Sequence, residues 1–340
     1  MRRLPAALPA LALVAACSSG TPAGSTDGPF TGSTSATPIP GASSTTASAT
    51  PTPNGPPRLV VRTLPGRLPY VIAREAVIRR GHLLVVAGGL QPGNVTTPET
   101  FVYDTDTGRS RPGAALPVAV HDVAGAFAGG SLVVVGGGNA TVQDVVQAAA
   151  PDLVGGWQVI GHLPQPRADV MATRAGRQIV VLGGYDGRTP AVGTAVASID
   201  GVHWAPYAEL PVATRYSATA VFDKDVYLFG GEVSSTMQRA VQRVDAHGHA
   251  KVVARLPVPL GHSVAVRLGD RILLAGGRTT ATSLTDRMWW FDPATDTLTP
   301  AGHLPTPLAD AQVAAVGGTA YVVGGETPAY SDRVVTLTLR

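Results

Sequence analysis

The chain has 340 residues with 26 basic and 23 acidic side chains, and its formal net charge is +3. Only 14% of the residues are charged, 40 are glycine and one is cysteine. The near balance of charge argues against a nucleic-acid-binding protein. A single cysteine excludes an internal disulfide framework.

Residues 1–16 have the pattern of a secretory signal peptide. Arg2 and Arg3 precede an apolar stretch that is too short to cross a bilayer as a mature helix. The stretch ends in Val-Ala-Ala-Cys at residues 14–17, which resembles a bacterial lipobox. The resemblance implies that the thiol of Cys17 is lipidated and that Cys17 becomes the mature N-terminus. We therefore expect attachment to a bacterial cell membrane on its extracytoplasmic face, a chance cysteine being the alternative.

Residues 17–57 are predicted to form a disordered tether. They consist mostly of Ser, Thr, Pro, Gly and Ala, and Asp27 is the single charged side chain. Such a segment has too little apolar surface to fold. A coil of about 40 residues has a typical reach of about 35 Å. Cleavage after the signal would remove Arg2 and Arg3, leaving 24 basic and 23 acidic residues.

From residue 58 onward the chain repeats itself six times. Each copy has a Leu-Pro pair and, 20 positions after its Leu, a Gly-Gly pair that closes a short apolar run. The leucines are Leu68, Leu116, Leu163, Leu210, Leu256 and Leu304. The first glycines are Gly88, Gly136, Gly183, Gly230, Gly276 and Gly324. A fixed period of 46 to 48 residues predicts one structural unit repeated around an array.

Each unit is predicted to contain four antiparallel strands. A two-residue turn lies 13 and 14 positions after the Leu, and five of the six turns begin with glycine, as a tight hairpin requires. The apolar run that follows, such as residues 84–87, is typical of a fully buried strand. A third strand ends near an Asp, as at Asp104 and Asp292, and a fourth carries Trp157, Trp204 or Leu298. Blades of this kind must be packed between neighbours, which favours an all-β propeller.

The pattern resembles that of the kelch family of propellers over residues 58–340. The resemblance is carried by the Gly-Gly pair, the aromatic-Asp end of the third strand and the Trp of the fourth. It implies a six-bladed kelch-type β-propeller. Two features depart from the family: an Arg soon after Leu-Pro occurs only as Arg167, and several units lack the Trp. A WD-repeat propeller is disfavoured because no Trp is followed by Asp.

The two ends of the repeat region are predicted to complete one blade together. The chain stops 16 residues after Gly324, where the third strand of the last unit should end. Residues 58–63 form an orphan strand before the first unit. Pairing it with residues 333–339 would supply the missing fourth strand and leave no exposed sheet edge.

Polar residues recur at one rim of the predicted channel. The first strand begins at the same rim where the second ends, so two sets of positions meet there. Six positions after each Leu lie Arg74, Asp122, Asp169, Tyr216, His262 and Asp310. Directly after the Gly-Gly pairs, the polar residues are Tyr185, Glu232, Arg278 and Glu326. These ten residues are the candidate ligand-binding set.

Two interpretations of the rim remain open. The residues can pair among themselves, Arg74 with Asp122 and Asp310, and Arg278 with Glu232 and Glu326. Alternatively they bind a small polar ligand or glycan, since concave sites with convergent polar groups favour ligands. Trp289 and Trp290 are a further candidate contact: we expect one ring in the core and the other exposed to a partner.

The sequence favours a binding or interaction module over an enzyme. No complete catalytic set, metal site or cofactor motif is present in it, and we expect a monomer that binds a protein partner or an envelope glycan. A copper enzyme of the galactose oxidase type would need a Tyr-Cys crosslink, for which Cys17 is not free. The alternative is a sugar-modifying enzyme resembling the sialic acid mutarotase, with Asp122 beside Asp169, or Glu232 near Arg278, as acid and base.

Overall fold

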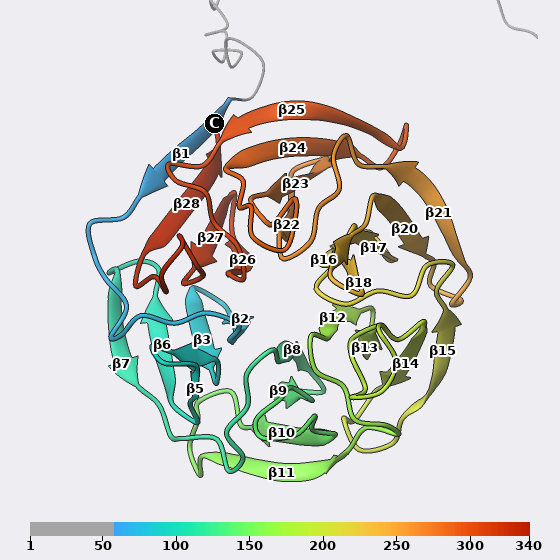
Figure 1. The fold of residues 1–340 in the computed structure, drawn as a ribbon. Helices are drawn as coiled ribbons and strands as arrows, with labels where there is room; N and C mark the ends of the chain where they lie inside the picture. Colours follow the sequence, from blue (N-terminus) through green and yellow to red (C-terminus); the bar gives the residue numbers. More distant parts are fainter. Residues whose placement is uncertain (1–57) are drawn as a thin grey trace, which may run out of the picture. The chain divides into compact units, whose positions relative to one another are not determined.

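The computed structural model describes residues 58–340, which form six four-stranded antiparallel sheets around a central channel (Figure 1). The predicted signal peptide, Cys17 and the tether lie outside the described residues. Within residues 58–340 no helix is long and apolar enough to cross a membrane. The expectation of an all-β, six-bladed kelch-type propeller is confirmed.

Blades 1 to 5 run from the channel outward in chain order. Blade 1 consists of β2 (Ala76–Arg80), β3 (Leu83–Ala87), β6 (Thr100–Asp104) and β7 (Arg109–Pro112). Blade 2 consists of β8 (Ala124–Ala128), β9 (Ser131–Val135), β10 (Val145–Ala149) and β11 (Trp157–His162). Blade 3 consists of β12 (Met171–Ala175), β13 (Gln178–Leu182), β14 (Thr194–Ser198) and β15 (Ala205–Glu209). Blade 4 consists of β16 (Ala218–Phe222), β17 (Asp225–Phe229), β20 (Ala240–Val244) and β21 (Ala250–Arg255). Blade 5 consists of β22 (Val264–Leu268), β23 (Arg271–Ala275), β24 (Arg287–Asp292) and β25 (Thr297–His303). Two small hairpins, β4 (Leu90–Gln91) with β5 (Val95–Thr96) and β18 (Glu232–Val233) with β19 (Thr236–Met237), follow the second strands of blades 1 and 4.

Blade 6 is closed by the first strand of the propeller, as predicted. It consists of β26 (Gln312–Val316), β27 (Thr319–Val323), β28 (Val334–Leu339) and β1 (Leu59–Thr63). β1 and β28 are antiparallel, from the pair Leu59 and Leu339 to the pair Thr63 and Val335. Figure 1 shows β1 on the outside of blade 6, beside the C-terminus. The ring therefore has no open seam.

The Gly-Gly pairs join each blade to the next one. In all six blades the second glycine donates its N–H to a backbone carbonyl of the following blade, over 2.7–2.9 Å. In blade 1 the acceptor is Val120, and a Cβ on the first glycine, Gly88, would lie 2.5 Å from that same oxygen. Gly88 also has a φ of +68°, which L-residues rarely adopt. The repeat signature is therefore a requirement of the junction between blades.

The apolar core lies between the blades, because both faces of every blade are covered. β24 shows this clearly: Trp289 packs with Phe291 toward blade 4, while Trp290 packs toward blade 6. Their exposed fractions are 5% and 7%. The expectation that one of the two rings is exposed to a partner is wrong, since alternation along a strand sends the rings into two different cores.

Candidate functional site

Six backbone hydrogen bonds form a closed ring at one mouth of the channel. The ring consists of the six residues that lie six positions after each Leu: Arg74, Asp122, Asp169, Tyr216, His262 and Asp310. Each donates its N–H to the carbonyl of the equivalent residue in the preceding blade, over 2.9–3.1 Å. All six have a positive φ, between 51° and 62°. The left-handed backbone just before each inner strand therefore gathers these six residues around the channel axis.

A second layer of side chains lies just outside this ring. In every blade the residue after the Gly-Gly pair bridges the residue that precedes the ring position, for example Glu232 with Arg215 and Tyr185 with Ala168. This register brings Tyr185, Glu232, Arg278 and Glu326 to the same mouth as the ring. We call the ten predicted residues together with Arg215 the rim cluster.

Arg74 connects the carboxylates of blades 2 and 6. Its Nη1 donates to Oδ2 of Asp122 over 3.3 Å, and its Nε donates to Oε1 of Glu326 over 3.2 Å. Its Nε also lies 3.8 Å from Oδ1 of Asp310. The predicted pairing of Arg74 with Asp122 and Asp310 is therefore present.

Arg278 and His262 extend the chain of charges through blades 5 and 4. Arg278 donates to Oδ2 of Asp310 over 3.2 Å and pairs with Glu326. His262 lies between two carboxylates, with Nδ1 2.6 Å from Oδ1 of Asp310 and Nε2 3.0 Å from Oε2 of Glu232. The expected contact of Arg278 with Glu326 is present, but Glu232 pairs with His262 and Arg215 instead of Arg278.

Arg215 is a member of the rim cluster that the sequence analysis missed. It pairs with Glu232, and its Nη1 donates to Oδ2 of Asp169 over 3.1 Å. Its guanidinium carbon lies 5.3 Å from the ring centre of Tyr185 and 5.7 Å from that of Tyr216. The repeat did not mark Arg215 as a polar site position, because the equivalent positions of the other blades hold Ala, Gly or His.

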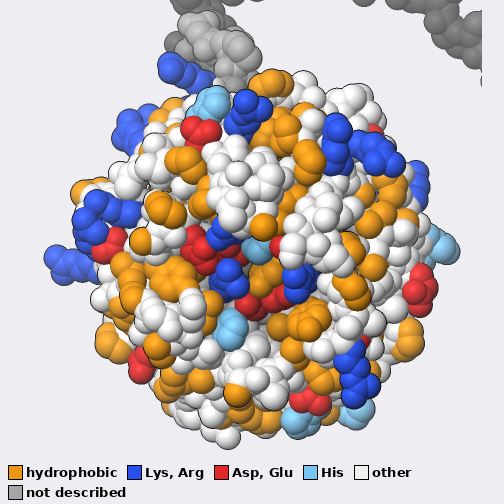
Figure 2. Space-filling view, in the orientation of Figure 1, with side chains coloured by type: hydrophobic (Ala, Val, Ile, Leu, Met, Phe, Trp, Pro, Cys, Tyr) orange, Lys and Arg blue, Asp and Glu red, His pale blue; other side chains and the backbone are white. Residues whose placement is uncertain are grey.

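Tyr216 and Arg74, from opposite blades, are in contact across the mouth of the channel. Nη1 of Arg74 donates to the hydroxyl of Tyr216 over 3.2 Å, and the Tyr216 ring stacks on His262 at 3.9 Å. Figure 2 shows the centre of this face filled with acidic, basic and histidine side chains. Beneath it lies a cavity of about 660 Å³, walled by the six inner strands. Each inner strand is an edge of its sheet, so unpaired backbone N–H and C=O groups line the channel.

The cluster gives its carboxyl groups different proton affinities. Burial and the neighbouring Asp122 raise the pKa of Asp169 to about 7. The hydrogen bond from His262, followed by that from Arg215, lowers the pKa of Glu232 to about 2. Burial disfavours a charged His262, but Asp310 and Glu232 outweigh it and raise the pKa of His262 to about 9. At neutral pH, His262 is charged, Glu232 is ionised and Asp169 is partly protonated.

Glu75, next to the ring, is a second residue that the sequence analysis missed. It is fully buried between blades 1 and 6, and neither carboxyl oxygen has a hydrogen-bond partner among the described residues. Burial raises the pKa of Glu75 to about 8. Glu75 directly follows Arg74, and the equivalent positions of the other units hold Val, Ser or Ala, so no recurring polar pattern marked it.

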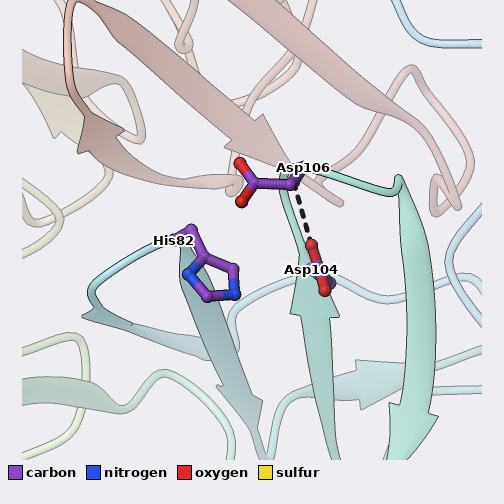
Figure 3. A group of neighbouring side chains, drawn as sticks. All are labelled: His82, Asp104 and Asp106. Atoms are coloured by element: carbon purple, nitrogen blue, oxygen red, sulfur yellow. Dashed lines mark hydrogen bonds between the residues drawn. The ribbon is translucent and has the colours of Figure 1, made fainter.

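A separate group of possible metal ligands lies at a hairpin end of blade 1. Figure 3 shows His82, Asp104 and Asp106, whose ligand atoms lie within 4.8 Å of one another. Oδ1 of Asp104 already accepts the backbone N–H groups of Asp106 and Thr107, at 2.9 and 3.1 Å. His82 and Asp106 are exposed to solvent. These contacts describe a solvated turn, and we assign it no ligand.

Comparison with known proteins gives distant likenesses. No protein-family model matches the chain. Human kelch-like protein 38 is 25% identical over 258 residues, which are 71% of this chain and 42% of that protein. The N-acetylneuraminate epimerase of Pasteurella multocida (strain Pm70) is 28% identical over 158 residues, 36% of this chain and 41% of the enzyme. The chain thus spans less than half the length of these curated relatives.

The fold has a close structural counterpart. A solved structure of YjhT matches with a TM-score of 0.70 and 16% sequence identity, covering 81% of this chain and 96% of that one. The likeness at this identity concerns the fold, and it agrees with the six repeats and with the kelch-like relatives. The repeats, the fold and these likenesses together support a six-bladed kelch-type β-propeller.

Proposed function

We propose that this propeller is a binding module attached by Cys17 to the extracytoplasmic face of a bacterial membrane, and that its rim cluster receives a polar ligand. The ligand is a partner protein or an envelope glycan. The observation that carries the proposal is the rim cluster itself, in which the polar side chains of all six blades are gathered at a single channel mouth.

The rim cluster is suited to recognising a ligand, because its side chains are held in place and remain partly exposed. Its guanidinium groups are fixed by two or more contacts each, yet the side chains of Arg74 and Arg215 remain 24% and 20% exposed. Fixed donors lose little conformational entropy when a ligand arrives. Tyr185, half-buried beside Arg215, adds an aromatic face of the kind enriched at binding sites.

The test places a photo-crosslinking amino acid in the intact protein in cells. With p-benzoylphenylalanine at residue 185, we expect a crosslinked adduct in the membrane fraction, and with the same group at residue 154 we expect none. Val154 is the control because it is 74% exposed and lies in the loop between β10 and β11, away from the rim cluster. The adduct at residue 185 should weaken when Asp169→Asn is added. Cys17→Ala should move the protein out of the membrane fraction.

Three results would contradict the proposal. Equal adducts at residues 154 and 185 would mean that the rim has no special contact. An adduct that Asp169→Asn leaves unchanged would place the contact outside the rim cluster. Membrane retention of Cys17→Ala would contradict the lipid anchor.

A sugar-modifying enzyme is a second candidate, favoured by the likeness to an N-acetylneuraminate epimerase. The rim holds two carboxyl groups with widely separated pKa values, about 7 for Asp169 and about 2 for Glu232, joined by Arg215. One protonated and one ionised carboxyl group near a sugar anomeric centre are what proton transfer there requires.

This second candidate predicts faster equilibration of sugar anomers. The protein is added to freshly dissolved N-acetylneuraminate, and the anomers are followed by proton NMR. Catalysis would raise the rate above that in buffer, and Asp169→Asn would return it to the buffer value because the proton donor is lost. Rates equal to buffer for the unmodified protein would exclude this reaction and leave the binding module.

A further inference from the structure

The chain of charges in the rim cluster is interrupted at one place. From Asp122 it passes through Arg74, Glu326, Arg278, Asp310, His262, Glu232 and Arg215 to Asp169, and each link joins opposite charges. The two ends of this chain, Asp122 of blade 2 and Asp169 of blade 3, are neighbours. The N–H of Asp169 donates to the carbonyl of Asp122 over 3.0 Å. The two aspartates therefore follow one another around the ring with no cation between them, and the hydroxyl of Tyr216 lies close to both side chains. We call this place the acidic gap.

The residues around the acidic gap leave part of it without a partner. Arg74 occupies Oδ2 of Asp122, and Arg215 occupies Oδ2 of Asp169. Oδ1 of Asp122 is buried and has no hydrogen-bond partner among residues 58–340. Asp122 is 9% exposed and Asp169 is 7% exposed, and both line the central cavity. A buried acceptor without a donor is costly unless a ligand supplies one.

The charge balance of the rim cluster points the same way. Five carboxylates face four cations, since His262 is held in its charged form. His121 does not make up the difference: its Nε2 lies 3.5 Å from Oδ2 of Asp122, but burial and Arg74 lower its pKa. Tyr216 stays neutral because burial raises its pKa well above the ordinary value. With all five carboxyl groups ionised the cluster would carry one excess negative charge. Burial raises the pKa of both Asp122 and Asp169, so the acidic gap is where the cluster takes up a proton or another positive charge.

Resting on the proposed binding role of the rim, we propose that the acidic gap binds the protonated primary amine of a hydroxyl-rich ligand, such as an amino sugar. An ammonium group carries one positive charge and three donors. Asp122 and Asp169 offer the acceptors. A divalent metal ion is less suitable, because Ca²⁺ or Mg²⁺ needs about six oxygen ligands. The free backbone edges of the inner strands can bind hydroxyl groups of a sugar inside the 660 Å³ cavity.

The test compares three sugars that differ at one substituent. Glucosamine, N-acetylglucosamine and glucose are titrated into the protein at pH 7, with binding followed by saturation-transfer NMR and calorimetry. We expect saturable binding of glucosamine, and binding of the other two at least about tenfold weaker, equivalent to about 1.4 kcal/mol. Asp122→Asn and Asp169→Asn should each weaken glucosamine binding about tenfold. Asp223→Asn is the matched control, because Asp223 is an exposed carboxylate in the turn between β16 and β17, outside the rim cluster, and its effect should stay below about threefold.

The outcomes separate this inference from the proposed function. If glucose or N-acetylglucosamine binds as tightly as glucosamine, the rim is a sugar site without amine recognition, and the inference is wrong while the proposed function stands. If Asp223→Asn weakens glucosamine binding as much as Asp169→Asn, the loss reflects the net charge of the protein, and the inference about the acidic gap is wrong. If no sugar binds but the crosslink at residue 185 forms, a proton alone occupies the gap and the inference fails.

Discussion

Gly88→Ala is expected to destabilise the propeller by about 2–5 kcal/mol, because two costs add. The left-handed backbone at φ +68° costs an L-residue about 1–2 kcal/mol. The new Cβ would also lie 2.5 Å from the carbonyl oxygen of Val120, which accepts the N–H of Gly89. Relief of that clash requires blades 1 and 2 to separate, and overpacking of this kind costs about 1–3 kcal/mol or more. Thermal and urea unfolding measure the loss.

Gly81→Ala, in the same blade, is the matched control. Gly81 has a similar φ of +61°, but a Cβ there would meet nothing within 4 Å. Gly81→Ala should therefore lose only about 1–2 kcal/mol of stability, which is the cost of placing an L-residue in the left-handed backbone conformation. Equal losses for the two variants would show that the backbone conformation alone, and not the junction between blades, explains the Gly-Gly repeat.

This contrast explains why the fold was predictable from the sequence. The same junction is built six times, so its steric demand appears at six equally spaced glycine pairs. Closure by β1 was predictable for a related reason, since a missing strand at one end and an orphan strand at the other have one simple solution. The turn positions also repeat, with Asp223 adopting the same left-handed conformation as the five glycines.

The contacts within the rim cluster were predictable only in part. The positions of Arg74 and Asp310 follow from the repeat, and so does their pairing, because blades 1 and 6 are neighbours. The partner of Glu232 does not, because Arg215 occupies a repeat position that holds Ala, Gly or His in the other blades. Long side chains choose partners across blades by reach and geometry, which spacing along a single chain does not encode. The same holds for Trp290, whose burial depends on the neighbouring blade.

Glu75→Gln is expected to stabilise the protein, and increasingly so as the pH rises. The pKa of Glu75 is about 8 in the folded state and 4.5 in the reference state. Between these values the folded chain binds more protons than the unfolded chain, so stability falls by about 1.4 kcal/mol per pH unit. The penalty is absent below pH 4.5 and complete above pH 8. The amide of the variant does not titrate. At pH 7 the free energy of unfolding of the variant should therefore be about 3 kcal/mol larger than that of the unmodified protein.

Urea unfolding at pH 5, 7 and 8 tests this prediction. The two proteins should differ little at pH 5 and most at pH 8, because only the unmodified protein carries the cost of ionising a fully buried carboxyl group. Glu99→Gln is the control, since Glu99 is an exposed glutamate of the same blade and its replacement should change stability by less than about 0.5 kcal/mol at every pH. A constant difference between Glu75→Gln and the unmodified protein across the three pH values would show that Glu75 is ionised when folded. In that case an unseen donor or cation must accompany its carboxylate between blades 1 and 6.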